Sequence, residues 1–208
     1  MSKAEQTRAR ILDTAARLFR EQGYAAVSLR GIAAAEKMQG GSLYYHFRSK
    51  EEIVTEVLDT GIEIVHRAVV EGQAALPPAS PHETRIRAAL QAHLRALLEH
   101  SDYTSANVRI FGQVPKPVQK ANLKVRRAYE DCWSNILGAA QKDGAIAKKT
   151  DIRVVRLMLI GALNATLEWF DPKRGTADRL ADQFADNLLN GILARSKPVL
   201  AKTGTRTT

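Results

Sequence analysis

The sequence predicts an all-α protein in which an N-terminal three-helix helix-turn-helix domain is followed by a C-terminal helical bundle. Apolar residues recur with a period near 3.6 along most of the 208-residue chain, and no segment alternates convincingly with period two. Residues that favour helix ends separate the apolar stripes, because serines precede several of them and the Pro77-Pro78 pair follows another. The chain is long enough to bury a sizeable core.

Three helices are expected near the N-terminus. An apolar stripe over 11–19 ends near Gly23, a residue that suits the C-cap of a helix. Ser28 is the expected N-cap of a second, short helix, and a third follows over 42–46. The tight connection at 36–38 makes the last two a helix-turn-helix.

Two capping boxes mark the starts of longer helices. In such a box a serine side chain and a glutamate side chain three residues later each accept a hydrogen bond from the other residue's backbone N–H. Ser49 and Glu52 begin a helix over about 49–73, which connects the two expected domains. The second box has proline in the first helical position and consists of Ser80, Pro81 and Glu83.

Further helices complete the predicted bundle. A long helix extends to about Gly144, after a gap punctuated by Pro115 and Pro117. The segment 154–170 is apolar nearly all round but short for a bilayer span, so we expect a helix buried inside protein. Residues 201–208 are predicted to form a disordered tail. The last helix has one apolar face, made of Leu180, Phe184, Leu188 and Ile192.

Charge and cysteine content restrict the classes of function. Lys and Arg outnumber Asp and Glu by 31 to 22, so a polyanion is a reasonable partner, although solubility also explains surplus charge. The single cysteine, Cys132, excludes an internal disulfide, and the five histidines show no metal-ligand spacing. We therefore expect neither a metal nor a cofactor. The N-terminus lacks the apolar core of a signal peptide, so we expect a cytoplasmic protein without membrane association.

The stretch GGSLYYHF, at 40–47, carries the main functional indication. The second helix of a helix-turn-helix enters the DNA major groove, so its outer face must be slim. The two glycines let the backbone approach a duplex closely, and Leu43 and Phe47, four residues apart, anchor the helix inward. The polar groups expected to point outward toward phosphates belong to Tyr44, Tyr45 and His46.

The run from Ser28 to Leu58 resembles the DNA-binding domain of the TetR family of transcriptional regulators. The family's pattern fits without a gap onto Ser28, Ile32, Ala33, Gly41, Leu43, Tyr44, His46, Phe47, Ser49, Lys50 and Glu51. The resemblance implies a DNA-binding domain at 1–50 and an effector-binding and dimerisation domain at 51–200. It also implies a homodimer, paired through the last two long helices, that represses transcription from palindromic operator DNA until a small-molecule effector binds.

Three departures from the family pattern bear on base preference. Lys37 stands where glycine is usual, so it must accept a left-handed conformation or signal a reshaped turn. Gln39 replaces the usual serine and caps a helix poorly, but it can read adenine with two hydrogen bonds. Gly40 stands where lysine is common, which removes one phosphate contact. The residues expected to contact DNA are Ser28, Arg30, Lys37, Gln39, Gly40, Gly41, Ser42, Tyr44, Tyr45, His46 and Lys50; for Arg30 and Lys37, plain surface charge explains the residue equally well.

Polar residues on apolar helices indicate where an effector binds. Asn164, Thr166 and Glu168 interrupt the most apolar helix, so they either bond to neighbouring helices or face a cavity. His93 lies on an apolar stripe, where a packed core histidine is the simpler explanation. A run from Arg109 to Arg127 contains no acidic residue, which is also typical of a solvated helix face. The expected effector-binding residues are His93, Arg109, Phe111, Lys120, Lys124, Arg127, Tyr129, Trp133, Asn164, Glu168 and Trp169.

The apolar helix and the basic run together indicate the class of effector. An apolar tail with a phosphorylated head would use both, and an acyl-CoA thioester has that form. The segment ALNATLEWFDP also looks similar to family members that respond to acyl-CoA compounds. The alternative is a regulator of a drug-efflux gene that responds to a neutral or cationic, apolar drug-like ligand, for which Glu168 would matter and the basic run would not.

Two other classes of function are less well supported. An all-α enzyme lacks a site, because the sequence has no nucleophile elbow, paired-carboxylate motif or phosphate-binding loop. A ligandless architectural DNA binder does not need a bundle of this size with polar groups in its central helix.

Overall fold

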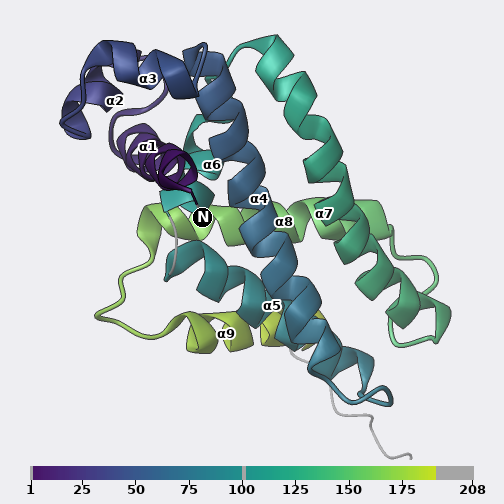
Figure 1. Cartoon of the computed structure of the whole chain (residues 1–208). Helices are drawn as coiled ribbons and strands as arrows, with labels where there is room; N and C mark the ends of the chain where they lie inside the picture. Colours follow the sequence, from purple (N-terminus) through teal and green to yellow (C-terminus); the bar gives the residue numbers. More distant parts are fainter. Residues whose placement is uncertain (1, 100–101, 191–208) are drawn as a thin grey trace, which may run out of the picture.

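The computed structural model describes residues 2–99 and 102–190, and over these ranges it forms helices and connecting turns (Figure 1). The all-α prediction is confirmed. The described helices are α1 (Lys3–Gln22), α2 (Leu29–Ala35), α3 (Gly40–His46), α4 (Lys50–Ala74), α5 (His82–Leu98), α6 (Asp102–Ile110), α7 (Lys116–Lys142), α8 (Ile152–Trp169) and α9 (Ala177–Asn190). The tail prediction for 201–208 and the apolar position Ile192 lie outside the described residues.

The expected ends of the first helices are confirmed. Gly23 caps α1 with a φ of 80°, a left-handed value that favours glycine, and its N–H donates to the carbonyl of Phe19. Ser28 caps α2, because its Oγ accepts a hydrogen bond of 3.1 Å from the backbone N–H of Gly31.

The two predicted capping boxes have different outcomes. Ser49 Oγ accepts from the backbone N–H of Glu52 at 3.1 Å, but the Glu52 carboxylate accepts from Arg48 N–H rather than from that of Ser49. The prediction of the second capping box is wrong. Pro81, not Ser80, is the N-cap of α5, because its ψ of 149° is extended and the helix begins only at His82 without a side-chain cap.

Helices α1–α3 and the first half of α4, hereafter the N-terminal domain, enclose one hydrophobic core (Figure 1). This core crosses the expected boundary at residue 50, and it includes α6 and the start of α7. Its fully buried side chains include Ile11, Phe19, Ile32, Phe47, Leu58 and Ile110.

A second core lies among the far half of α4, α5, α7, α8 and α9, with Trp133 at its centre. The expectation that 154–170 is buried inside protein holds for only one face of α8 in the single chain. Leu159, Leu163 and Thr166 are buried, whereas much of the opposite side of the helix is exposed in the single chain. Side chains at least half exposed there are Val154, Leu157, Met158 and Trp169. No helix among the described residues meets the length and hydropathy that a membrane span requires.

Helix α6, which has no clear pattern in the sequence, separates the two cores. Its Ala106 and Ile110 belong to the first core, and Tyr103 donates from its hydroxyl to Asp13 Oδ1 of α1 at 2.8 Å. Helix α6 crosses α4 at Gly61 so closely that a Cβ there would lie 2.9 Å from the carbonyl carbon of Tyr103 and 3.0 Å from Asn107 Cβ. Gly61 is therefore required by the approach of one backbone to another.

Replacing this glycine is expected to force the two helices apart. We predict that Gly61→Ala lowers the free energy of unfolding by about 1–3 kcal/mol, the usual cost of overpacking. Gly138→Ala, in α7, is the matched control, because a Cβ there would meet nothing within 4 Å. The control should be neutral or stabilising by up to about 1 kcal/mol, since alanine favours a helix over glycine. Urea unfolding measures both variants, and equal effects would contradict the close approach.

Candidate DNA-binding surface and effector pocket

Helix α3 has a buried and an exposed side, as its sequence predicts. Leu43 and Phe47 are fully buried, and the guanidinium of Arg8 lies 4.4 Å from the centre of the Phe47 ring. Tyr45 is 82% exposed, and the half-buried His46 meets its ring edge-on at 5.2 Å. Tyr44 is also exposed, so α3 presents hydroxyl and imidazole groups rather than charges to its surroundings.

The turn before α3 adopts the strained of the two expected conformations. Lys37 has a φ of 54°, in the left-handed region that costs a non-glycine residue about 1–2 kcal/mol. Two backbone bonds hold this turn, since Lys37 N–H donates to Ala34 O and Met38 N–H donates to Ala33 O. Gln39 occupies the N-cap position without a side-chain capping bond, and its exposed amide is available to an outside partner.

The glycines of α3 are not explained by packing within the chain. A Cβ at Gly40 or Gly41 would meet nothing within 4 Å, and both residues are exposed. Small residues here keep the outer side of α3 thin without serving the chain's own core. The exposed residues around them are Ser28, Arg30, Lys37 and Ser42.

Lys50 lies differently from the phosphate-contacting position expected for it. Its Nζ donates to the carbonyls of Tyr24 and Val27, each at 2.7 Å, and lies 3.9 Å from the centre of the Tyr24 ring. Burial lowers the pKa of Lys50, although Glu51 opposes the shift. The ammonium group is thus engaged inside the protein, where it ties the start of α4 to the segment between α1 and α2.

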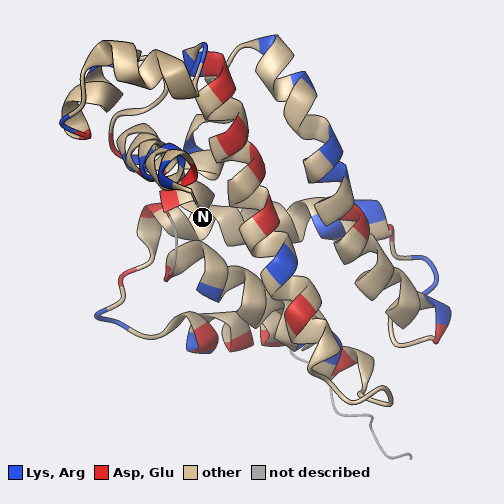
Figure 2. Cartoon of the chain, in the orientation of Figure 1, with Lys and Arg blue, Asp and Glu red and all other residues tan. Residues whose placement is uncertain are grey.

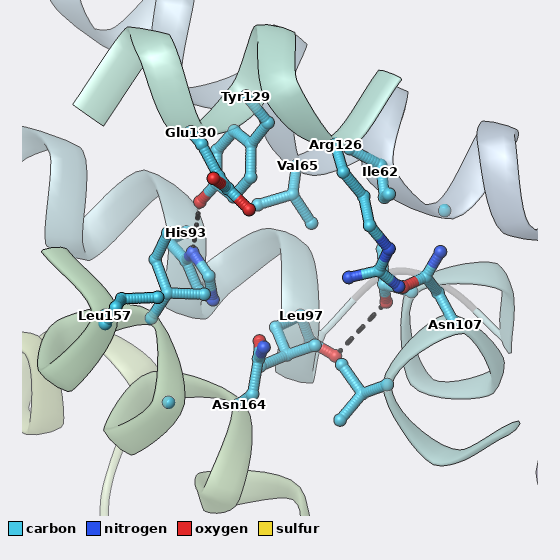
Figure 3. A pocket seen from close by; sticks show the side chains of 15 residues that line it. Ile62, Val65, His93, Leu97, Asn107, Arg126, Tyr129, Glu130, Leu157 and Asn164 are labelled. Carbon is cyan, nitrogen blue, oxygen red and sulfur yellow. Dashed lines mark hydrogen bonds between the residues drawn. The ribbon is translucent and has the colours of Figure 1, made fainter. Parts of the chain in front are cut away.

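A cavity of about 270 Å³ lies among α4, α5, α6, α7 and α8 (Figure 3). Most of its wall is apolar, which is typical of small-molecule sites. The lining side chains labelled in the figure are Ile62, Val65, His93, Leu97, Asn107, Arg126, Tyr129, Glu130, Leu157 and Asn164.

Several expected effector-binding residues meet at this cavity. His93, Tyr129 and Asn164 line it. Trp133 lies one layer behind, where its Nε1–H donates to the Tyr129 hydroxyl at 2.7 Å. The ring of Phe111 stacks on the Arg126 guanidinium, 3.5 Å from its central carbon.

The other expected effector-binding residues are not brought to the cavity. Glu168 is exposed, and Trp169 lines a separate hollow with Phe170 and Leu180. Figure 2 shows basic residues along α7, and of these only Arg126 lines the cavity. A residue advances about 100° around a helix, so positions two apart, such as Lys124 and Arg126, face opposite sides. The exposed basic residues are Arg109, Lys120, Lys124 and Arg127.

Arg126 is the main cavity residue that sequence reasoning missed. Its Nε–H donates to Asn122 Oδ1 and a terminal N–H donates to Asn107 Oδ1, both at 2.8 Å. Burial lowers its pKa to about 10, and the more distant Glu130 only partly offsets this effect. Glu130 itself is paired with Arg156 at 3.0 Å. The sequence did contain an indication, because Asn122, Arg126, Tyr129 and Trp133 recur at helical spacing.

His93 is a buried neutral histidine. Its Nδ1 is hydrogen-bonded to the Tyr129 hydroxyl, and its Nε2 is buried without a partner in the described part of the chain. Burial lowers the pKa of His93 to about 4, and the nearby Asn164 side chain opposes the shift. The ring is therefore uncharged at neutral pH.

The buried His93 should make stability depend on pH. The unfolded chain binds this proton near pH 6.5 and the folded chain only near pH 4, so acidification across that window favours unfolding. We expect His93 to contribute a loss of up to about 3 kcal/mol in the free energy of unfolding. Urea unfolding of the wild type and of His93→Phe at several pH values measures it. The same pH dependence in both proteins would assign the effect to other groups.

Comparison with known proteins gives the family. Residues 11–57 match the model for bacterial regulatory proteins of the tetR family, and residues 79–192 match the tetracyclin repressor-like C-terminal domain. The HTH-type transcriptional repressor KstR2 of Rhodococcus jostii (strain RHA1) is 29% identical over 195 residues, which cover 89% of this chain and 90% of that protein.

Solved structures show the same fold. The TetR family regulator PfmR from Thermus thermophilus has a TM-score of 0.78 and 25% identity, over 90% of this chain and 98% of PfmR. AibR in complex with isovaleryl coenzyme A and operator DNA has a TM-score of 0.77 and 23% identity, over 86% of this chain and 96% of AibR. The chain belongs to the TetR family of transcriptional regulators and is a helix-turn-helix regulator of the repressor type, not an enzyme.

Proposed function

We propose that the chain is a ligand-responsive repressor that binds a palindromic operator as a homodimer and leaves it when an apolar effector enters the cavity. The observation that carries this proposal is the position of α6. Thr104, Asn107 and Val108 line the cavity, while Ala106 and Ile110 of the same helix pack in the core of the N-terminal domain. A ligand that moves this helix therefore acts on the DNA-binding helices directly.

In the proposed complex α3 lies in the major groove. Gln39, Gly40 and Ser42, at its start, lie nearest the bases, since recognition helices contact base edges with their N-terminal residues. The exposed hydroxyls and imidazole farther along, together with flanking cations, contact phosphates and position the helix. These residues are Ser28, Arg30, Lys37, Tyr44, Tyr45 and His46.

The proposed dimer pairs α8 and α9 with the same helices of a second chain. The exposed side of α8 is apolar, and a groove between α8 and α9 is lined by Met158, Ala162, Phe184 and Leu188. Such a face is costly to leave in water, and pairing across a two-fold axis buries it on both chains. Two recognition helices can then reach successive major grooves, about 34–36 Å apart.

An acyl-CoA thioester is the first candidate effector. The apolar cavity of about 270 Å³ suits an acyl group, while the larger coenzyme would extend outside it. AibR, whose fold is similar, binds isovaleryl coenzyme A together with operator DNA. The exposed basic residues of α7 do not line the cavity, so they give no support of their own to the expected phosphate contacts. A cationic drug-like ligand has weaker support, since Glu168 is exposed and Glu130 is paired with Arg156.

The DNA-binding assignment is tested by fluorescence anisotropy on duplexes from the DNA that flanks the gene. Tyr44→Ala should weaken binding to all sequences by roughly 2- to 12-fold, as expected for one lost hydrogen bond. Gln39→Ala should instead alter base preference. Glu71→Gln, on the exposed far end of α4, is the control, and the titration should saturate at two chains per palindrome. Unchanged affinity in a Tyr44→Ala, Gln39→Ala double variant would place the operator contacts elsewhere.

The effector assignment is tested by calorimetry and by operator release. Octanoyl-CoA is expected to bind and to release the operator. Val65→Phe, which fills the cavity, should abolish the octanoyl-CoA response while operator binding persists. Neutralising Lys120, Lys124 and Arg127 together should leave octanoyl-CoA affinity unchanged, because none of these exposed side chains lines the cavity. If neither acyl-CoAs nor the matching acids bind, this effector class is excluded.

A further inference from the structure

The Arg126 end of the cavity presents a cation with spare hydrogen-bond donors. A guanidinium has five N–H donors, and Asn107 and Asn122 accept from two of its nitrogens. In the described part of the chain no carboxylate forms an ion pair with it, since Glu130 is occupied by Arg156. Stacking on Phe111 fixes the plane of the group at the cavity wall.

The His93 end presents a second donor, which follows from a chain of hydrogen bonds. Trp133 Nε1–H can only donate, so the Tyr129 hydroxyl accepts from it. The hydroxyl oxygen could accept a second hydrogen bond, but no other acceptor for its own proton is present among the described residues, so we assign that proton to His93 Nδ1, the ring nitrogen within hydrogen-bond distance of it. A neutral ring with an accepting Nδ1 carries its proton on Nε2. That N–H is buried at the cavity beside the Asn164 side chain, and in the described part of the chain it forms no hydrogen bond of ordinary geometry.

These two donors lie on opposite sides of the cavity. Figure 3 shows Arg126 beside Asn107 on one side and His93 above Asn164 on the other. Apolar side chains line the space between them, among them Val65 and Leu97. The wall thus offers a donor at each end, and apolar side chains line most of the space between them, where the Asn164 amide and the Glu130 carboxylate, which is paired with Arg156, also lie.

We propose that Arg126 and His93 select an effector with an oxygen acceptor at each end of an apolar body. This inference rests on the proposed effector cavity. Arg126 binds the carboxylate or thioester oxygen, and His93 Nε2–H binds a neutral ketone or hydroxyl oxygen at the far end. A plain saturated acyl chain leaves the His93 donor unpaired, and burying an unpaired donor is unfavourable. The preferred ligand is therefore an oxo acid or its thioester rather than an ordinary fatty acyl compound.

Calorimetry with matched probes tests the two ends separately. The probes are octanoic acid, its methyl ester, a set of oxo-octanoic acids with the ketone at successive carbons, and the coenzyme A thioester of each acid. The best oxo acid should bind wild type more tightly than octanoic acid by roughly 2- to 12-fold, the range of a neutral hydrogen bond. Octanoic acid should bind the wild type more tightly than its methyl ester by roughly 12- to 150-fold, the range for a hydrogen bond to a charged group. The thioesters show whether Arg126 receives a carboxylate or a thioester oxygen.

Variants then assign each preference to its residue. Arg126→Met should remove the preference for acid over ester, and His93→Phe should remove the preference for the oxo acid. The matched controls are Arg67→Met, an exposed arginine of α4, and His66→Phe, a half-buried histidine whose ring is near Tyr129 but does not line the cavity. Both controls should keep both preferences.

The comparison of ligands on the wild type still tests the proposal if a variant fails to fold. Binding without either preference, or preferences that persist in folded Arg126→Met and His93→Phe, would overturn two-ended recognition. Absence of binding by acids, esters and thioesters alike would instead overturn the proposed effector class itself.

Discussion

The close packing of α6 on α4 is the constraint on which the rest of the structure depends. Gly61 lets the α6 backbone approach within van der Waals contact, and Asn107 then donates to the Leu58 carbonyl of α4. This approach makes one short helix a wall of the cavity and a part of the N-terminal core at once. Since packed interiors transmit strain, the proposed route from the cavity to the DNA-binding helices passes through α6 and its contacts with α1 and α4.

The N-terminal domain was largely predictable because its geometry is local. The spacing of Leu43 and Phe47 fixes which side of α3 is buried, and Ser28 and Ser49 fix where two of the helices begin. The role of Lys50 was not predictable, because its partners are carbonyls of a loop 23 and 26 residues away. A basic residue beside a helix-turn-helix suggests phosphate contact, but only the folded loop shows which oxygens its ammonium reaches.

The cavity was harder to predict because it depends on how five helices meet. Composition indicated the basic residues of the run 109–127 as a whole. The orientation of α7 about its own axis determines which basic side chain of that helix faces the cavity. Arg126 and Arg127 are adjacent, and only the first is at the cavity. Helical spacing from Tyr129 and Trp133 would have singled out Arg126. The local sequence does not predict that Glu168 and Trp169 lie on the surface, because their exposure depends on how α8 packs against the other helices.

Arg126, a half-buried arginine without a carboxylate partner among the described residues, makes one end of the cavity energetically different from the rest. Removing a cation from water is costly, and the amides of Asn107 and Asn122 with the Phe111 ring compensate only in part, as the lowered pKa of Arg126 indicates. A ligand oxygen at this guanidinium gains more than it would at a surface arginine, because solvent screens it less. The same guanidinium holds Asn107, and through it Leu58 of α4. In the proposed mechanism, a ligand bound there shifts the repressor between its DNA-bound and released states only if it interacts differently with the positions that α6 takes in the two states.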